Sequence, residues 1–214
     1  MKKKIVIDIL MFVLILLEFS KAYMSPIWHE LFGLLLVVLI IIHLILNKSY
    51  LKSINKGNYT IKRFIMLISN ILFFLTFLLS VIFGILSSQE LFKYFSIGTY
   101  GIQFLHKIFS YISLLLLGIH LGINFNSMFG KVRRKINNVV ILYVIDILII
   151  FYGLYSLIKL EILKHVIGKY GFGLVDGNIV INIFRYFSVI MMFSIVINYF
   201  YKKYKGKNKW KRYF

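Results

Sequence analysis

The sequence predicts an all-α fold, a polytopic bundle of about six transmembrane helices, and three observations support this. Hydrophobic residues make up 60% of the 214 positions and charged residues only 15%. The mean hydropathy is +0.86, outside the range of soluble domains of this size. Several apolar stretches approach the roughly 20 residues that a helix needs to cross the hydrocarbon core. We therefore expect a multi-pass protein of the plasma or inner membrane, surrounded by lipid.

Six apolar stretches are expected to span the membrane, and Pro26, Gly57 and Gly130 fall between them as helix breakers. The expected spans are residues 5–23, 27–46, 64–86, 101–123, 138–158 and 184–203. We divide the chain into a four-helix membrane domain (1–136), two further helices (137–203) and a basic cytoplasmic tail (204–214). The first stretch, with Lys2–Lys4 before it and Ser20-Lys21-Ala22 at its end, also resembles a cleavable signal peptide, but we favour a retained helix.

The distribution of basic residues predicts the orientation. The N-terminal lysines, the loops 47–63 and 124–137 and the tail from residue 202 hold 19 of the 26 lysine and arginine residues. Short basic loops stay in the cytoplasm, so both termini are expected there. The formal charge of +19 then reflects topology and attraction to anionic lipid, and we expect no nucleic-acid binding.

Four of the five histidines fall inside expected spans, where ionisable side chains are costly and usually functional. His29 and His43 are 14 residues apart, and so are His106 and His120. Fourteen residues bring a helix back to within about 40° of the same face and advance it by roughly 21 Å. Each of these two helices therefore carries two imidazoles on one face, one near each side of the membrane.

The second and fourth spans are parallel in this topology, so His29 is expected to face His106 at the outer level and His43 to face His120 at the inner level. Two axial imidazoles per iron are typical of a low-spin haem that transfers electrons. Since cysteine is absent, iron–sulfur clusters and covalent c-type haem are excluded, and we expect two b-type haems. The alternatives are structural core histidines or a zinc or copper ion, although four ligands at two depths cannot meet one ion.

An internal repeat accompanies the histidines. A shift of 77 residues superposes His29 on His106, His43 on His120, and Asn47 on Asn124. Each repeat would be a helical hairpin whose second helix provides one ligand to each haem.

Other residues are candidates for supporting roles. Gly33, Gly118 and Gly122 lie within a turn of a histidine and would either admit a flat macrocycle or pack against another helix. Arg63 is a candidate for binding a haem propionate on the inner side. Asp146, in the middle of a span, would handle protons or serve a quinone site, or form a buried hydrogen bond to a neighbour such as Asn70.

These residues resemble the flavinylation-associated cytochromes, a family of small membrane proteins formerly known as a domain of unknown function. The resemblance covers residues 5–125 and rests on His29-Glu30 with Gly33, His43, Asn47, Leu105-His106, Ser110-Tyr111 and Gly118-Ile119-His120-Leu121-Gly122. It implies a redox relay that passes electrons to extracytoplasmic proteins bearing covalent flavin mononucleotide. The chain has no flavin-attachment pattern, so the flavin would belong to a partner.

Three hypotheses follow, and the first is favoured. The chain is a di-haem conduit that takes electrons from a membrane quinol such as menaquinol, or from a cytoplasmic donor. Alternatively it is a quinol-oxidising cytochrome b subunit with a substrate site of its own. The third hypothesis is a non-redox transporter or assembly protein. A stand-alone enzyme is disfavoured, because no Gly-x-Gly-x-x-Gly fingerprint of a nucleotide-binding domain follows a strand.

Overall fold

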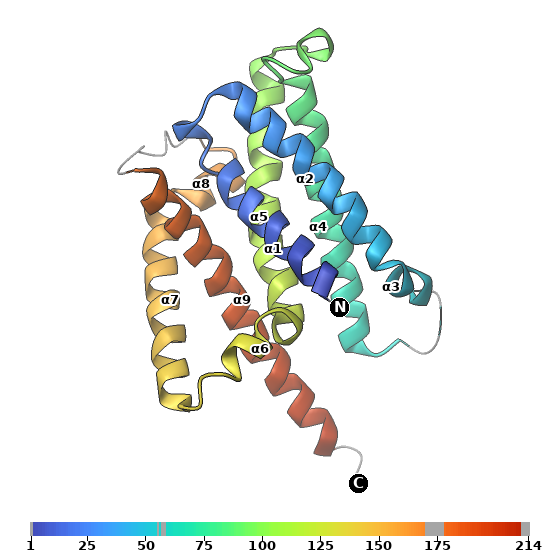
Figure 1. The fold of residues 1–214 in the computed structure, drawn as a ribbon, viewed down its shortest axis with the longest axis vertical. Coiled ribbons are helices and arrows are strands. Elements are labelled where there is room, and N and C mark those ends of the chain that lie inside the picture. The colour runs from blue at the N-terminus through green and yellow to red at the C-terminus, as the bar shows by residue number, and fades with distance from the viewer. Residues whose placement is uncertain (1, 55, 57–58, 170–177, 211–214) are drawn as a thin grey trace.

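The structure, a computed structural model, describes residues 2–54, 56, 59–169 and 178–210 (Figure 1). It is 83% helical, and no strand occurs in these residues, which confirms the all-α prediction. In chain order the elements are α1 (Lys2–Glu18), the 3₁₀ turn η1 (Lys21–Tyr23), α2 (Pro26–Leu46), α3 (Lys48–Ser53), α4 (Ile61–Leu86), η2 (Lys93–Phe95), α5 (Tyr100–Met128), α6 (Gly130–Arg133), α7 (Val139–Lys159), α8 (Ile162–Val166) and α9 (Ile179–Trp210).

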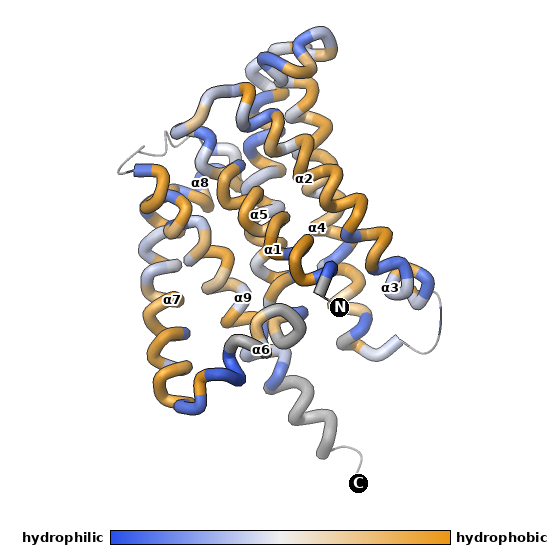
Figure 2. The backbone as a smooth tube through the Cα atoms, viewed as in Figure 1, coloured by the Kyte–Doolittle hydropathy of each residue, from blue (hydrophilic) through white to orange (hydrophobic). Residues whose placement is uncertain are grey.

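Five helices in the described part of the chain are long and apolar enough to cross a membrane: α2, α4, α5, α7 and α9. Figure 2 shows apolar residues along α2, α4 and α7 and hydrophilic residues near α3 and α6, at the ends of these helices. The sequence predicted a sixth span over 5–23. The structure ends this helix at Glu18, after 17 residues, which is short of the about 20 residues that a full crossing requires.

The helix boundaries follow from local chemistry. Ser25 precedes Pro26 at the first position of α2, where the missing N–H of proline has no intrahelical partner to lose. The Thr60 side chain caps α4 by accepting the backbone N–H of Arg63, and the Asn138 side chain caps α7 in the same way. At the other end of the chain, α9 continues to Trp210, so much of the expected tail 204–214 is helical. Residues 211–214 and the expected break at Gly171–Gly177 lie outside the described residues.

The helices α1, α2, α4, α5, α7 and α9 run alternately up and down the bundle (Figure 1). As a result, α1 begins and α9 ends at the same end of the molecule, beside α3 and α6. The turn 87–99, η1 and α8 lie at the opposite end. The loops that carry most of the basic residues therefore share one end, as the predicted topology requires.

The interior of the bundle is built around α5 and α9. Their contact buries Leu114, Leu117, Val189 and Ile190, while the outer faces of α2, α4 and α7 keep many exposed apolar side chains. Such an apolar exterior is expected where lipid is the solvent.

Gly118 and Gly122 allow α5 and α9 to approach closely. A Cβ on Gly118 would lie 2.7 Å from the Cβ of Phe193, and a Cβ on Gly122 would lie 2.8 Å from the backbone oxygen of Ser194. Of the two roles left open for these glycines, the structure assigns helix packing. Each lies two residues from His120 in the helix, about 200° around the axis, so neither shares the face of the histidines.

This contact generates a stability prediction. Replacing Gly118 by Ala should lower the midpoint of thermal unfolding in mild detergent, because the new methyl group overpacks the contact with α9 at a cost of about 1–3 kcal/mol. The matched control is Gly101→Ala, at an exposed position of the same helix where an added Cβ meets no atom within 4 Å. That variant should unfold at the wild-type midpoint or slightly above it. Equal midpoints for the two variants would contradict this packing.

Candidate functional site

The four membrane histidines lie on α2 and α5, two on each helix. The rings of His29 and His106 are 6.2 Å apart between centroids, with their planes at 78°. His43 and His120 lie close enough for a charge on one to act on the other. The structure thus brings together residues far apart in the sequence as two pairs, one at each level.

The outer pair fits two axial ligands of one metal ion. A metal–imidazole bond of about 2 Å on each side of the ion places the two ring centroids roughly 6 Å apart. The 6.2 Å between His29 and His106 is compatible with this spacing, and with planes at 78° it also lies within the range of edge-to-face ring contacts.

Nδ1 has a hydrogen-bond partner in His43, His106 and His120, and in His29 it lies at ion-pair distance from a carboxylate. On α5, Nδ1 of His106 lies 2.8 Å from the backbone oxygen of Ser80, and Nδ1 of His120 lies 2.9 Å from Oδ1 of Asn70. On α2 the acceptors are carboxylates of α1: Nδ1 of His43 lies 2.7 Å from Oδ1 of Asp8, and Nδ1 of His29 lies 3.0 Å from Oε2 of Glu18. An acceptor at Nδ1 favours the tautomer with the proton on Nδ1, so Nε2 would be the nitrogen that could coordinate a metal.

Glu18 and His29 are incompletely paired within the described residues. Their contact has the length of an ion pair, but Nδ1 of His29 and Oε1 of Glu18 are buried there without a hydrogen bond. A buried carboxylate is costly unless a positive charge compensates it. A ferric haem between His29 and His106 would supply that positive charge. These two histidines and Glu18 therefore fit a haem.

Two glycines border the outer pair. A Cβ on Gly84 would lie 3.1 Å from the ring of His106, so the absence of a side chain on α4 makes room for this imidazole. Gly33, expected either to admit a macrocycle or to pack, lies under the Glu18 carboxylate, whose Oε2 would be 3.6 Å from an added Cβ. This is an ordinary contact distance, so Gly33 adjoins the acceptor of His29 and a Cβ would also fit there.

The inner histidines, His43 and His120, also have an acceptor at Nδ1, which favours a proton on that nitrogen. The side-chain nitrogen of Asn47 lies 3.2 Å from Nε2 of His43 and donates to the backbone oxygen of the same residue at 2.9 Å. Nε2 thus carries the lone pair that coordination requires, and Asn47 would have to rotate away to release it. Asn124, the repeat counterpart of Asn47, donates to the backbone oxygen of His120 at 3.0 Å.

The two ligand helices are not packed against each other. The backbone of α2 runs along α1 and stays apart from α4 and α5 over nearly its whole length. Such a separation is what two facing imidazoles with a metal between them require. A direct helix contact would leave no space for the ligand pair.

Glu30 ties the outer end of α2 to the turn between α4 and α5. Its Oε1 accepts the backbone N–H groups of Gln89 and Glu90 at 2.7 and 3.1 Å. Its Oε2 accepts the backbone N–H of Leu91 at 2.6 Å and the hydroxyl of Ser88 at 2.8 Å. Because Glu30 follows His29 directly, this clamp sets where His29 lies relative to His106.

Two other candidates have different partners from those expected. Arg63 donates to the backbone oxygens of Ser53 and Ile54 and lies over the ring of Tyr59, so it fastens the end of α3. Asp146 accepts two hydrogen bonds from Arg133, at 2.6 and 2.8 Å. The pair lines an apolar cavity of ≈ 150 Å³ between α5, α7 and α9. Asn70, considered as a partner of Asp146, instead binds His120 and Tyr50.

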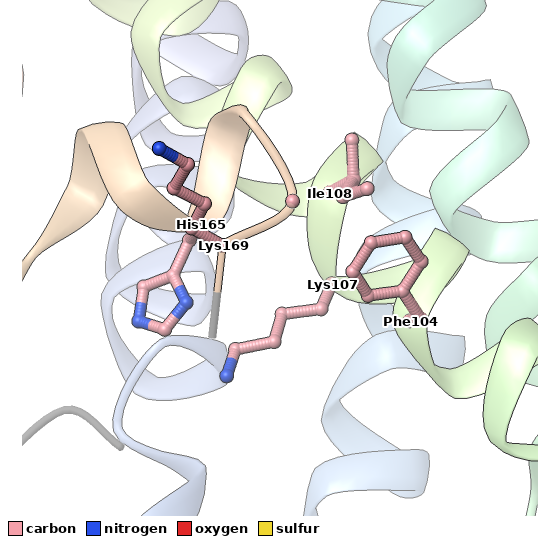
Figure 3. A pocket seen from close by; sticks show the side chains of 6 residues that line it. Phe104, Lys107, Ile108, His165 and Lys169 are labelled. Carbon is pink, nitrogen blue, oxygen red and sulfur yellow. The ribbon is translucent and has the colours of Figure 1, made fainter. Parts of the chain in front are cut away.

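His165, which the sequence places in a loop, is buried in α8. Its ring stacks on Tyr111 at 4.4 Å, and the Tyr111 hydroxyl lies 3.1 Å from that of Tyr186. Figure 3 shows Lys107 extending across a small pocket toward His165. Burial and the nearby Lys107 ammonium lower the pKa of His165 to about 4.

Four residues that contact the histidines or position them were not predicted as site residues: Asp8, Glu18, Glu30 and Gly84. For Asp8 and Glu18 a signal was available, because carboxylates are costly in an apolar segment and invite the search for a partner. Within the described residues, no three histidine, aspartate or glutamate side chains come together as a group that could hold a metal ion by themselves. Comparison of the chain with family models, with curated proteins and with solved structures finds no match.

The Glu30 clamp generates a prediction. Glu30→Gln removes the negative charge and one acceptor oxygen. The free energy of opening for the amides of residues 89–91 should fall by about 1.5–3 kcal/mol, the value of a lost charged hydrogen bond, so these amides should exchange hydrogen faster. Glu90→Gln changes an exposed carboxylate in the same turn and is the control. Unchanged exchange in Glu30→Gln would show that the clamp does not hold this turn.

His165 generates a pH prediction. Its folded pKa of about 4 lies below the unfolded value of about 6.5. Between these values the unfolded chain binds the extra proton, so this contribution to stability is present above about pH 6.5 and is lost as the pH falls to about 4. Thermal unfolding at a series of pH values should show a smaller loss for His165→Phe than for the wild type. Identical slopes would contradict a depressed pKa.

Proposed function

We propose that the chain transfers electrons across the membrane through two bis-histidine b-type haems, as its resemblance to the flavinylation-associated cytochromes implies. The observations that support the proposal are the approach of His29 on α2 to His106 on α5 and the polar partners at Nδ1 of His43, His106 and His120. His29 and His106 would hold the outer haem, and His43 and His120 the inner one. When bound, each haem supplies a reversible one-electron centre.

The residues of the chain perform the supporting tasks. The acceptors at Nδ1 orient the imidazoles and hold the proton on the nitrogen that does not coordinate. The apolar helices keep water away from the two levels, and the roughly 21 Å between histidines on one helix extends the path across the hydrocarbon core. We propose a membrane quinol or a cytoplasmic protein as donor and an extracytoplasmic flavoprotein as acceptor.

The geometry favours a conduit over a quinol-oxidising subunit. That alternative would use Asp146 as a base in the membrane, but both of its carboxylate oxygens accept hydrogen bonds from Arg133. A proton acceptor for a quinol would have to break this pair first.

Counting haem tests the proposal. Pyridine haemochrome analysis of the purified protein should give two haems per chain. His29→Ala or His106→Ala should leave one, and so should His43→Ala or His120→Ala, because each removes one axial ligand. His165→Ala is the matched control and should retain both, since this histidine stacks on Tyr111 away from the two pairs.

Two outcomes would contradict the proposal. One is a colourless wild-type protein after haem-supplemented expression, which would support a non-redox transporter or assembly protein. The other is loss of a haem from His165→Ala with none lost from His29→Ala. Electron transfer itself is measured in vesicles that enclose ferricyanide. A reductant added outside should reduce the enclosed ferricyanide only when the wild-type protein is in the membrane.

A further inference from the structure

The acceptors of the four histidines differ in charge according to the helix that provides them. Both α2 histidines face a carboxylate of α1, Asp8 or Glu18. Both α5 histidines face a neutral oxygen of α4, from Ser80 or Asn70. In each hairpin the two acceptors are 10 residues apart in sequence, against 14 for the histidines. The arrangement is thus repeated in position but not in charge.

A carboxylate at Nδ1 has a different effect on an imidazole from a neutral oxygen. It draws the Nδ1 proton toward itself and increases the electron density at Nε2, which makes the imidazole a stronger donor to a metal. A stronger donor and a nearby negative charge both stabilise the oxidised iron over the reduced one.

The surroundings of the carboxylates strengthen this effect. The side chains of Glu18 and His29 are each 16% exposed, and those of Asp8 and His43 are 32% and 28% exposed. The apolar exterior of the bundle adjoins lipid, so these residues are screened less than they would be in water. The Glu18 charge is also incompletely compensated within the described residues, since its Oε1 is buried without a partner.

We propose that Asp8 and Glu18 are positioning residues that lower the reduction potentials of the two haem sites, Asp8 at the inner level and Glu18 at the outer level. This inference rests on the proposed function, because it concerns the same histidine pairs. It gives α1 a role although that helix contributes no ligand: it brings two negative charges to the imidazoles of α2. The neutral acceptors of α4 leave the α5 imidazoles as the weaker donor of each pair.

The experiment measures one haem at a time. Asp8→Asn is introduced into His29→Ala, which retains the inner haem, and Glu18→Gln into His43→Ala, which retains the outer haem. Potentiometric titration in lipid nanodiscs at one fixed pH should give a higher midpoint potential than the parent in both cases, with the low-spin spectrum unchanged. Glu161→Gln changes the carboxylate that pairs with Lys164 beside α8, and it should leave both midpoints where they are.

A reciprocal variant keeps the test decisive if a carboxylate is needed for folding. Asn70→Asp places a charged acceptor at His120 and should lower the midpoint of the inner haem. Unshifted midpoints in Asp8→Asn, Glu18→Gln and Asn70→Asp, with haem still bound, would overturn the inference and leave the proposed function intact. That outcome would make Asp8 and Glu18 simple ties between α1 and α2. A wild-type chain without haem would instead overturn the proposed function, and the inference with it.

Discussion

The structure depends on one constraint, that a polar group inside lipid must find its partner within the protein. His43, His106 and His120 meet this constraint with a hydrogen bond from Nδ1 to the preceding helix of the same hairpin, and Nδ1 of His29 lies 3.0 Å from Glu18 on that helix. The acceptors determine which helices must be neighbours: α1 must pack on α2, and α4 on α5. These are two of the main helix contacts in the bundle.

The same constraint explains why α2 and α5 face each other without packing. In each hairpin, the first helix provides the partner for Nδ1 of the histidines on the second helix. The Nε2 side of each ring is therefore left for the other hairpin. The two hairpins are therefore held together near their ends. Glu30 binds the turn at residues 88–91 at the outer end.

Much of the fold could be predicted from the sequence, and the histidine spacing was its most informative feature. Hydropathy located α2, α4, α5 and α7 to within a few residues, because a span of lipid demands a continuous apolar run. It overestimated the first span, since apolar residues continue past Glu18 although the helix ends there. The partners of Asp8, Glu18 and Asp146 could not be predicted, because they depend on how helices distant in the sequence are rotated against one another. Gly118 and Gly122 show the same limit, since proximity in sequence to a histidine does not tell which face of the helix a residue occupies.

The position of α5 has a consequence for how a cofactor would bind. One face of α5 is packed against α9 through Gly118 and Gly122, and the opposite face carries His106 and His120, so these two histidines lie on a helix of the buried core. Their counterparts lie on α2, which has an exposed apolar outer face and packs mainly on the short α1. Under the proposed function, each haem would connect α5 to the hairpin of α1 and α2. Part of the haem binding free energy would therefore stabilise the packing of this hairpin on the bundle. Asp8 and Glu18 of α1 would then act on the imidazoles of α2, the helix with fewer packing contacts. There, an oriented and strongly donating imidazole would contribute most to holding the metal.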